Sequence, residues 1–287
     1  MSGVSQATLR GTGALGVIIR DSKEPRVAQI GDGEFEIDAE GVHYRLLNFE
    51  VRRLAKEGAK RIVIRNVRGQ RYIGTGIKRK GLRIEVHGTA GNDLAAFMDG
   101  PEIEVYGDAQ DGVGNTMNDG TVVVHGSAGD VLGYGMRGGR LYIYGDAGYR
   151  VGIHMKAYKN QVPRIVVGGT AGDFLGEYMA GGILIVLGIT GRPGRPITGD
   201  YVGTGMHGGL IFIRGEVDPF LFGKEVGIGE ITEEDRAVLR EEIENFSRYF
   251  GLPAEEILSS PFVKLYPKSH RPYGRLYAYW WLVTKKG

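Results

Sequence analysis

Residues 126–145 read Gly-Ser-Ala-Gly-Asp-Val-Leu-Gly-Tyr-Gly-Met-Arg-Gly-Gly-Arg-Leu-Tyr-Ile-Tyr-Gly, and this unit returns along the chain. It ends in a short run, 141–144, in which aliphatic and aromatic residues alternate before a glycine. Such alternation predicts a strand with one buried face. The closing glycine recurs at a constant spacing of 19 residues, at Gly88, Gly107, Gly126 and Gly145. A repeat this short has no room for a helix, so we interpret each unit as one coil of a β-helix.

Methionine follows the same register. Five successive units place it ten residues after the closing glycine, and a sixth places it after a longer insertion: Met98, Met117, Met136, Met155, Met179 and Met206. Residues at one repeat position lie above one another when coils stack, so we expect an internal methionine ladder that fills irregular space with flexible thioethers.

One repeat position is aromatic and is expected to face outward. It holds His87, Tyr106 and His125 in successive coils. The two histidines lie two coils apart, at ~9.6 Å from the strand spacing, which is too far for both to bind one metal ion. We therefore interpret these residues as a surface aromatic ladder and predict no metal site.

These patterns predict an all-β fold, a right-handed parallel β-helix of about 19-residue coils with small helical caps at both ends. The six-residue signature of the left-handed form is absent. The predicted divisions are residues 1–58 as an N-terminal extension and helical cap, 59–216 as the glycine-rich β-helix, and 217–287 as a C-terminal helical tail. Caps are expected because an open coil end leaves strand edges unpaired.

Two positions in the unit lead to a prediction about stability. We expect Gly145 to be a corner that requires a positive φ, and Arg140 to face outward. A β-branched residue adds strain at such a corner, so Gly145→Val should destabilise the protein far more than Arg140→Ala.

Composition excludes several classes of function. The 287 residues carry 36 Lys and Arg against 34 Asp and Glu, so the net charge of +2 gives no reason to expect a nucleic-acid or membrane partner. There is no cysteine, which excludes disulfides, thiolate-bound iron–sulfur clusters and a cysteine nucleophile. The first residues lack a secretion signal and no long apolar run follows, so we expect a cytoplasmic protein.

The segment from Arg52 to Arg83 is strongly basic and contains a single acid, Glu57. Such a run is either a solvated face or a docking surface for an acidic partner. In the second case, the interface residues would be Arg52 and Arg53 on the cap helix together with a corner at Lys78, Arg79 and Lys80. We expect reversal of the three corner charges to leave the fold intact.

The glycine-rich strings resemble a known family. Residues 129–139 (Gly-Asp-Val-Leu-Gly-Tyr-Gly-Met-Arg-Gly-Gly), 172–182 and 199–209 are similar to the GXGXG domain of the glutamate synthase large subunit, known as a right-handed β-helix. The likeness extends over roughly residues 35 to 275. The resemblance implies a non-catalytic scaffold, because in that family the glutaminase and the reductive centre lie on other domains.

The resemblance therefore implies a structural subunit of a glutamate synthase-type oxidoreductase, with amidotransferase and FMN-binding chains as partners. It implies FMN and an iron–sulfur cluster on those partners, and no catalytic, cofactor-binding or metal-binding residue on this chain. Two alternatives stay open: a β-helix subunit of a one-carbon oxidoreductase such as formylmethanofuran dehydrogenase, or a stand-alone β-helix enzyme. Assembly into a homo-oligomer also stays open.

Overall fold

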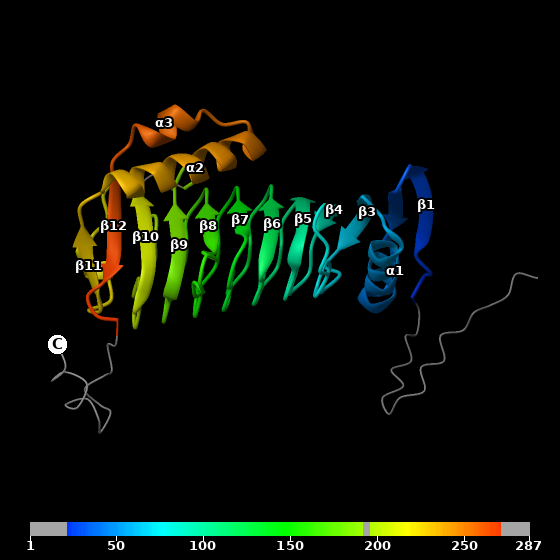
Figure 1. Ribbon diagram of the computed structural model, residues 1–287, viewed down its shortest axis with the longest axis horizontal. Helices are drawn as coiled ribbons and strands as arrows, with labels where there is room; N and C mark the ends of the chain where they lie inside the picture. The colour runs from blue at the N-terminus through cyan, green and yellow to red at the C-terminus, as the bar shows by residue number, and fades with distance from the viewer. Residues whose placement is uncertain (1–21, 192–195, 271–287) are drawn as a thin grey trace, which may run out of the picture.

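Parallel strands stacked in chain order form the body of the protein (Figure 1). The computed structural model describes residues 22–191 and 196–270. One twelve-stranded sheet runs from β1 to β10 in order and ends with β12 and β11. Strands β2 to β10 pair in parallel with their neighbours, which confirms the predicted all-β parallel β-helix. The strands are β1 (Arg26–Gly31), β2 (Glu34–Asp38), β3 (Arg61–Arg68), β4 (Arg83–Thr89), β5 (Asp99–Tyr106), β6 (Asp119–Val124), β7 (Arg140–Ile143), β8 (Arg164–Val167), β9 (Ala180–Val186), β10 (Gly208–Arg214), β11 (Val226–Gly229) and β12 (Phe262–Pro267).

The inner face of the coils is a continuous apolar core. Its first ladder joins aliphatic residues of successive strands across the sheet: Ile84, Ile103, Val122, Leu141, Ile165, Leu184 and Ile211. All seven are buried, as are the six repeat methionines. The methionine ladder is therefore confirmed, as is the apolar inner face of the strands. The expectation of a single buried face is wrong for the later strands, where outward residues such as Tyr142 and Val166 are buried as well.

The turn before each methionine places alternate residues in the left-handed conformation. In one coil these are Val131, Gly133 and Gly135, with φ of 52°, 68° and 56°. A Cβ on the central Gly133 would overlap Cδ1 of Ile165, a core residue further along the stack. A side chain there is opposed both by the backbone conformation and by the packing of the core.

Among the described coils, a single one has no glycine at the centre of this turn. Its central turn residue is Ala95, with φ of 60° and no exposed surface. The repeat register places Val122 where five other coils bring Ile or Leu against the turn glycine, and where Gly203 faces Val226. Val122 is the smallest residue in the inner ladder, so the missing methyl group compensates for the added Cβ.

The structure corrects the expectations for Gly145 and Arg140. Gly145 does not have the left-handed conformation. Glycine is needed at this position because an added Cβ would lie 3.0 Å from Gly126 O in the preceding coil. Arg140 does point outward, but its Nε donates to the buried carboxylate of Glu242 at 3.1 Å. Arg140→Ala is therefore expected to lower the free energy of unfolding substantially. The expected difference in stability between Gly145→Val and Arg140→Ala is smaller than the sequence suggested.

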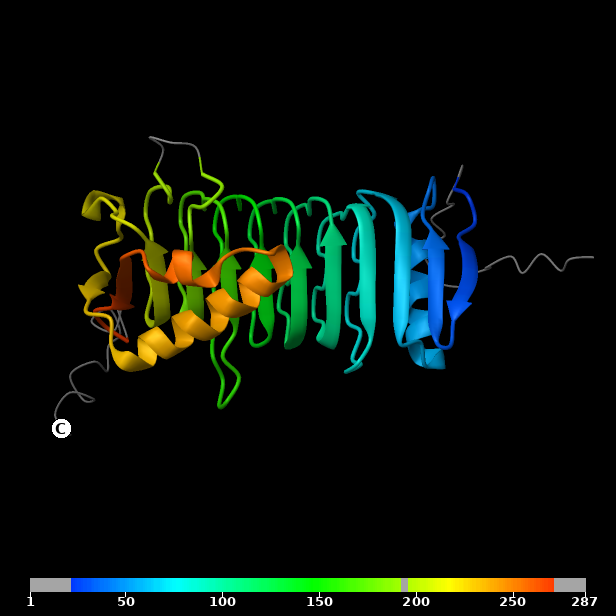
Figure 2. The same ribbon diagram turned by 90° about the horizontal axis from the view of Figure 1, so that it is seen from above.

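The helices do not cap both ends. Helix α1 (Tyr44–Glu57) lies at the N-terminal end, where Leu47, Val51 and Leu54 join the inner core (Figure 1). Helix α2 (Glu233–Phe250) instead lies along the outer face of the later strands, followed by α3 (Ala254–Leu258) (Figure 2). At the C-terminal end β12 pairs antiparallel with β10, and β11 pairs with β12, after a short 3-10 helix, η1 (Pro219–Leu221).

The three predicted divisions need adjustment as well. The parallel ladder begins at β2, before residue 59, because Glu34 and Ile37 already pair with β3. The predicted helical tail contains two strands in addition to its helices. Residues 271–287 and 1–21 lie outside the described part of the chain.

Helix α2 packs on the outer face of the sheet through apolar residues and through a buried carboxylate, that of Glu242. Glu242 has no exposed surface and accepts hydrogen bonds from Tyr142 Oη at 2.7 Å, from Arg140 and from Arg164. Burial, together with the neighbouring Glu242 charge, raises the pKa of the Tyr142 hydroxyl, which stays protonated and donates. Loss of one partner of such a buried group costs several kcal/mol, so α2 is a permanent brace of this half of the stack.

We predict that Gly133→Ala destabilises the protein more than Gly135→Ala. Both residues have positive φ, but a Cβ on Gly135 would meet its nearest neighbour, Thr116 Oγ1, only at 3.7 Å. Both variants lose about 1–2 kcal/mol because alanine disfavours the left-handed backbone, and only Gly133→Ala also overlaps Ile165. In urea unfolding, Ile165→Val should partly restore Gly133→Ala and should not help Gly135→Ala. Equal costs for the two alanines would contradict this packing.

Candidate functional site

Helix α1 carries two stripes of different character. His43 caps its start, where Nδ1 accepts from Arg45 N at 3.3 Å, and Gly58 ends it in the left-handed conformation with φ of 103°. The buried stripe faces the core. The opposite stripe follows the helical spacing i, i+4, i+7 and i+11 and is exposed: Arg45, Phe49, Arg52 and Lys56.

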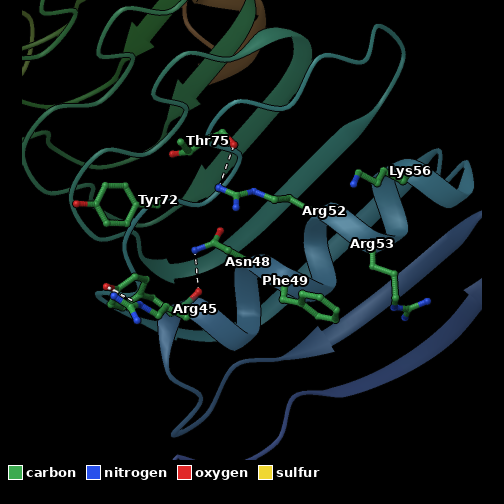
Figure 3. Close-up of a pocket in the computed structure, with 9 residues that line it drawn as sticks. Arg45, Asn48, Phe49, Arg52, Arg53, Lys56, Tyr72 and Thr75 are labelled. Atoms are coloured by element: carbon green, nitrogen blue, oxygen red, sulfur yellow. Dashed lines mark hydrogen bonds between the residues drawn. The ribbon is translucent and has the colours of Figure 1, made fainter. Parts of the chain in front are cut away.

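A pocket of about 540 Å³ lies between this exposed stripe and the turn of the first coil (Figure 3). The buried amide of Asn48 joins its two walls, because Nδ2 donates both to Tyr44 O at 2.8 Å and to Arg71 O at 2.7 Å. Arg52 Nη2 reaches Thr75 O at 3.4 Å across the pocket, as Figure 3 shows. The walls are therefore held together by contacts within the chain.

Two aromatic rings contribute to the wall beside Tyr44. Phe49 is 49% exposed and Tyr72 is 37% exposed. The Tyr72 ring centroid lies 5.7 Å from that of Tyr44, and Tyr72 has φ of 62°, an unusual conformation for a bulky residue. The pocket thus combines cations with accessible apolar surface.

Half of the twelve basic residues from Arg52 to Arg83 form ion pairs in the described structure, several of them with acids on other strands. Arg61 pairs with Glu34 at 3.0 Å and with Glu85 at 2.9 Å, and Arg65 pairs with Glu36 at 3.0 Å. The hydrogen bond from Arg61 holds the pKa of Glu85 below its ordinary value, so this carboxylate remains charged. Part of the excess of positive charge along the sequence is therefore balanced by acids that lie on neighbouring strands.

The structure divides the five predicted interface residues. Arg53 pairs with Glu50 at 2.8 Å and with Glu57, and Lys80 pairs with Asp119 at 3.1 Å. Arg79 is half-buried, and its Nη1 donates to Ala55 O at 2.6 Å near the end of α1. Arg52 lines the pocket and Lys78 is exposed, so the five do not form one free surface. Reversal of all three corner charges would break the contact of Arg79, which corrects the expectation that the fold is untouched.

Of the nine described residues that line this pocket, sequence reasoning proposed only Arg52 and Arg53 as interface residues. Arg45, Phe49 and Lys56 share the exposed stripe with Arg52, and Tyr72 comes from the adjoining turn. The helical spacing of the stripe was a usable signal. The position of Tyr72 could not be predicted from the sequence, because it depends on how the turn packs against α1.

The aromatic ladder on the outer face of β4 to β6 is also confirmed. The rings of His87, Tyr106 and His125 stack with centroids 4.8 Å apart at each step. Burial lowers the pKa of His87, which favours the neutral ring. Glu104 accepts a hydrogen bond from His125 Nε2 at 2.8 Å. In the described ranges, 22–191 and 196–270, no group of three or more His, Asp or Glu side chains could hold a metal ion.

Comparison with known proteins now identifies the family. The GXGXG motif model matches residues 52–268, which include the whole series of left-handed turns. The chain belongs to the GXGXG family. An uncharacterised member of similar sequence from Methanocaldococcus jannaschii is 50% identical over 254 residues, covering 86% of this chain and 97% of that one.

The GXGXG fold also has a solved structural counterpart. A chain in the crystal structure of the formyltransferase/hydrolase complex of Methylorubrum extorquens, determined with methylofuran, superposes with a TM-score of 0.56. Its sequence identity is 21%, and the match covers 82% of this chain and 92% of that one.

Among the helices of the described residues, none has the length and apolar character needed to cross a membrane.

We predict that Arg79→Ala and Lys78→Ala differ in stability although the residues are adjacent. Arg79 makes a charge-assisted hydrogen bond to the end of α1, worth about 1.5–3 kcal/mol, and Lys78 is an exposed cation. Chemical denaturation should show a clear loss for Arg79→Ala and a change within about 0.5 kcal/mol for Lys78→Ala. Faster amide exchange in residues 54–58 should accompany the first variant. Identical behaviour of the two would contradict the observed division of the basic corner.

Proposed function

We propose that this GXGXG protein is the structural β-helix subunit of a cytoplasmic, multi-chain oxidoreductase of the glutamate synthase type. In this role it positions an amidotransferase chain and an FMN-binding chain that perform the chemistry of glutamate biosynthesis. The observation that carries the proposal is the family match over residues 52–268 in a chain of 287 residues without any cysteine. The glutaminase and cluster chemistry of that family requires thiolates, which must come from partner chains.

The geometry suits a rigid support. Coils that share one continuous core resist bending, and the buried Glu242 network attaches α2 firmly to the later strands. The G-x-G-x-x-G strings at 133–138 and 203–208 lead into β7 and β10 rather than into helices. They therefore lack the helix N-terminus that binds a dinucleotide phosphate.

A second candidate is a β-helix subunit of a one-carbon oxidoreductase. It is favoured by the similar fold of the chain in the formyltransferase/hydrolase complex. The two candidates share the scaffold role and differ in the cofactor of their partners: FMN in the first case, and a molybdenum or tungsten pterin in the second.

We predict that the purified, partner-free chain binds neither FMN nor NAD(P)H, because its glycine-rich turns do not open helices. The same chain, affinity-tagged in its native host and purified at low salt, should bring with it an FMN-containing chain and an amidotransferase. Absorbance spectra and mass spectrometry of the purified material check both statements. A flavin spectrum in the partner-free chain would contradict the scaffold role, and a pterin cofactor in the purified assembly would favour the second candidate.

A further inference from the structure

We infer that the pocket beside α1 is the docking site for an extended acidic segment of a partner chain that carries one apolar or aromatic side chain. The inference deepens the proposed scaffold role and rests on it for the identity of the partner. The class of ligand is argued from the pocket alone. The segment would lie along the exposed stripe of α1, with its acidic side chains at the helix cations and its apolar side chain at Phe49 (Figure 3).

Three cations on one exposed face of α1 line this pocket. Within residues 22–191 and 196–270, Arg45, Arg52 and Lys56 form no ion pair, whereas Arg53 on the same helix is paired on both sides. The two acids near the pocket, Glu50 and Glu57, are the ones that Arg53 holds. A partner with complementary charge would therefore meet cations that are not already neutralised.

The spacing of these cations favours an elongated ligand. Positions 45 and 56 on one helix are about 16 Å apart along the axis at 1.5 Å per residue. No single phosphate or carboxylate could contact both ends of the stripe. About five residues of extended chain, at roughly 3.3 Å each, cover the same distance. The apolar surface of Phe49, between the cations, then requires an apolar side chain within the acidic segment.

The pocket exists before any ligand arrives. Asn48 joins its walls, Arg79 anchors the end of α1, and Arg52 is held near Thr75. Tyr72 is kept in the left-handed conformation at the rim with its ring accessible. The same conformation recurs at this turn position in later coils, as at Phe174 and Tyr201, so it belongs to the repeat and fixes Tyr72 in place. A preformed site loses less entropy on binding than a flexible surface.

The first experiment uses the full chain and a fluorescent peptide probe, Glu-Glu-Phe-Glu-Glu-Glu, in an anisotropy titration at low salt. We expect binding that weakens as salt increases, and a loss of about tenfold in the variant Arg45→Glu/Lys56→Glu. The matched control is Arg137→Glu/Lys156→Glu, which reverses two exposed cations elsewhere on the chain and should bind as the unmodified protein does. Phe49→Ala should weaken binding and abolish the preference for this probe over one with Ala in place of Phe.

The second experiment separates this inference from the proposed function. The unmodified chain and both charge variants are mixed with the FMN-binding chain of the same organism, after their melting temperatures have been compared. Reduced association of Arg45→Glu/Lys56→Glu alone supports the docking site. Equal association of all three proteins overturns it while leaving the scaffold role in place. If the unmodified chain binds the peptide but not the FMN-binding chain, the proposed partner is wrong and the ligand class stands. Absence of peptide binding at the unmodified pocket, or equal loss in the control, overturns the inference.

Discussion

The whole structure depends on a steric constraint in the glycine-rich turn. Each coil reverses direction through alternate left-handed residues, and the central one points at a core residue of a later coil. Where that residue is glycine, an added Cβ would come within 3 Å of an Ile, Leu or Val side chain, which the close packing of the core opposes. Stacking in one register then follows, and with it the ladders of aliphatic residues and methionines that hold the coils together.

The outer face of the same strands determines where the protein is braced and where it is open. At successive outer positions, Glu85 and Glu104 are followed by the apolar Val123, Val166 and Phe212 of the later strands. Helix α2 covers that apolar part, whereas the earlier part is closed by ion pairs within the sheet. At the N-terminal end, the exposed stripe of α1 carries Arg45, Arg52 and Lys56, which form no ion pair within the described residues.

The inner structure could be predicted from the sequence because it depends on short, regular spacings. The strand alternation, the methionine ladder and the stack of His87 and Tyr106 all follow from one repeat period. The position of α2 could not be predicted in this way, since the apolar outer residues that it covers are spaced a whole coil apart. The basic run was misleading for the same reason: the acids that neutralise Arg61 lie 27 and 24 residues away in sequence. Of the candidate site, the sequence indicated Arg52 and the general location, and packing determined the rest.

The most direct test of the turn constraint uses the one coil that departs from it. Val122→Ile introduces the larger ladder residue of other coils beside Ala95. It should destabilise the protein by about 1–3 kcal/mol, because the Cβ of Ala95 occupies the space that the added methyl group needs. Ala95→Gly/Val122→Ile recreates the pairing of the other coils and should recover most of that loss in urea unfolding. The account predicts a favourable coupling of at least about 1 kcal/mol between the two changes. Strictly additive effects would show that the turn and the inner ladder do not constrain each other, and would contradict the account.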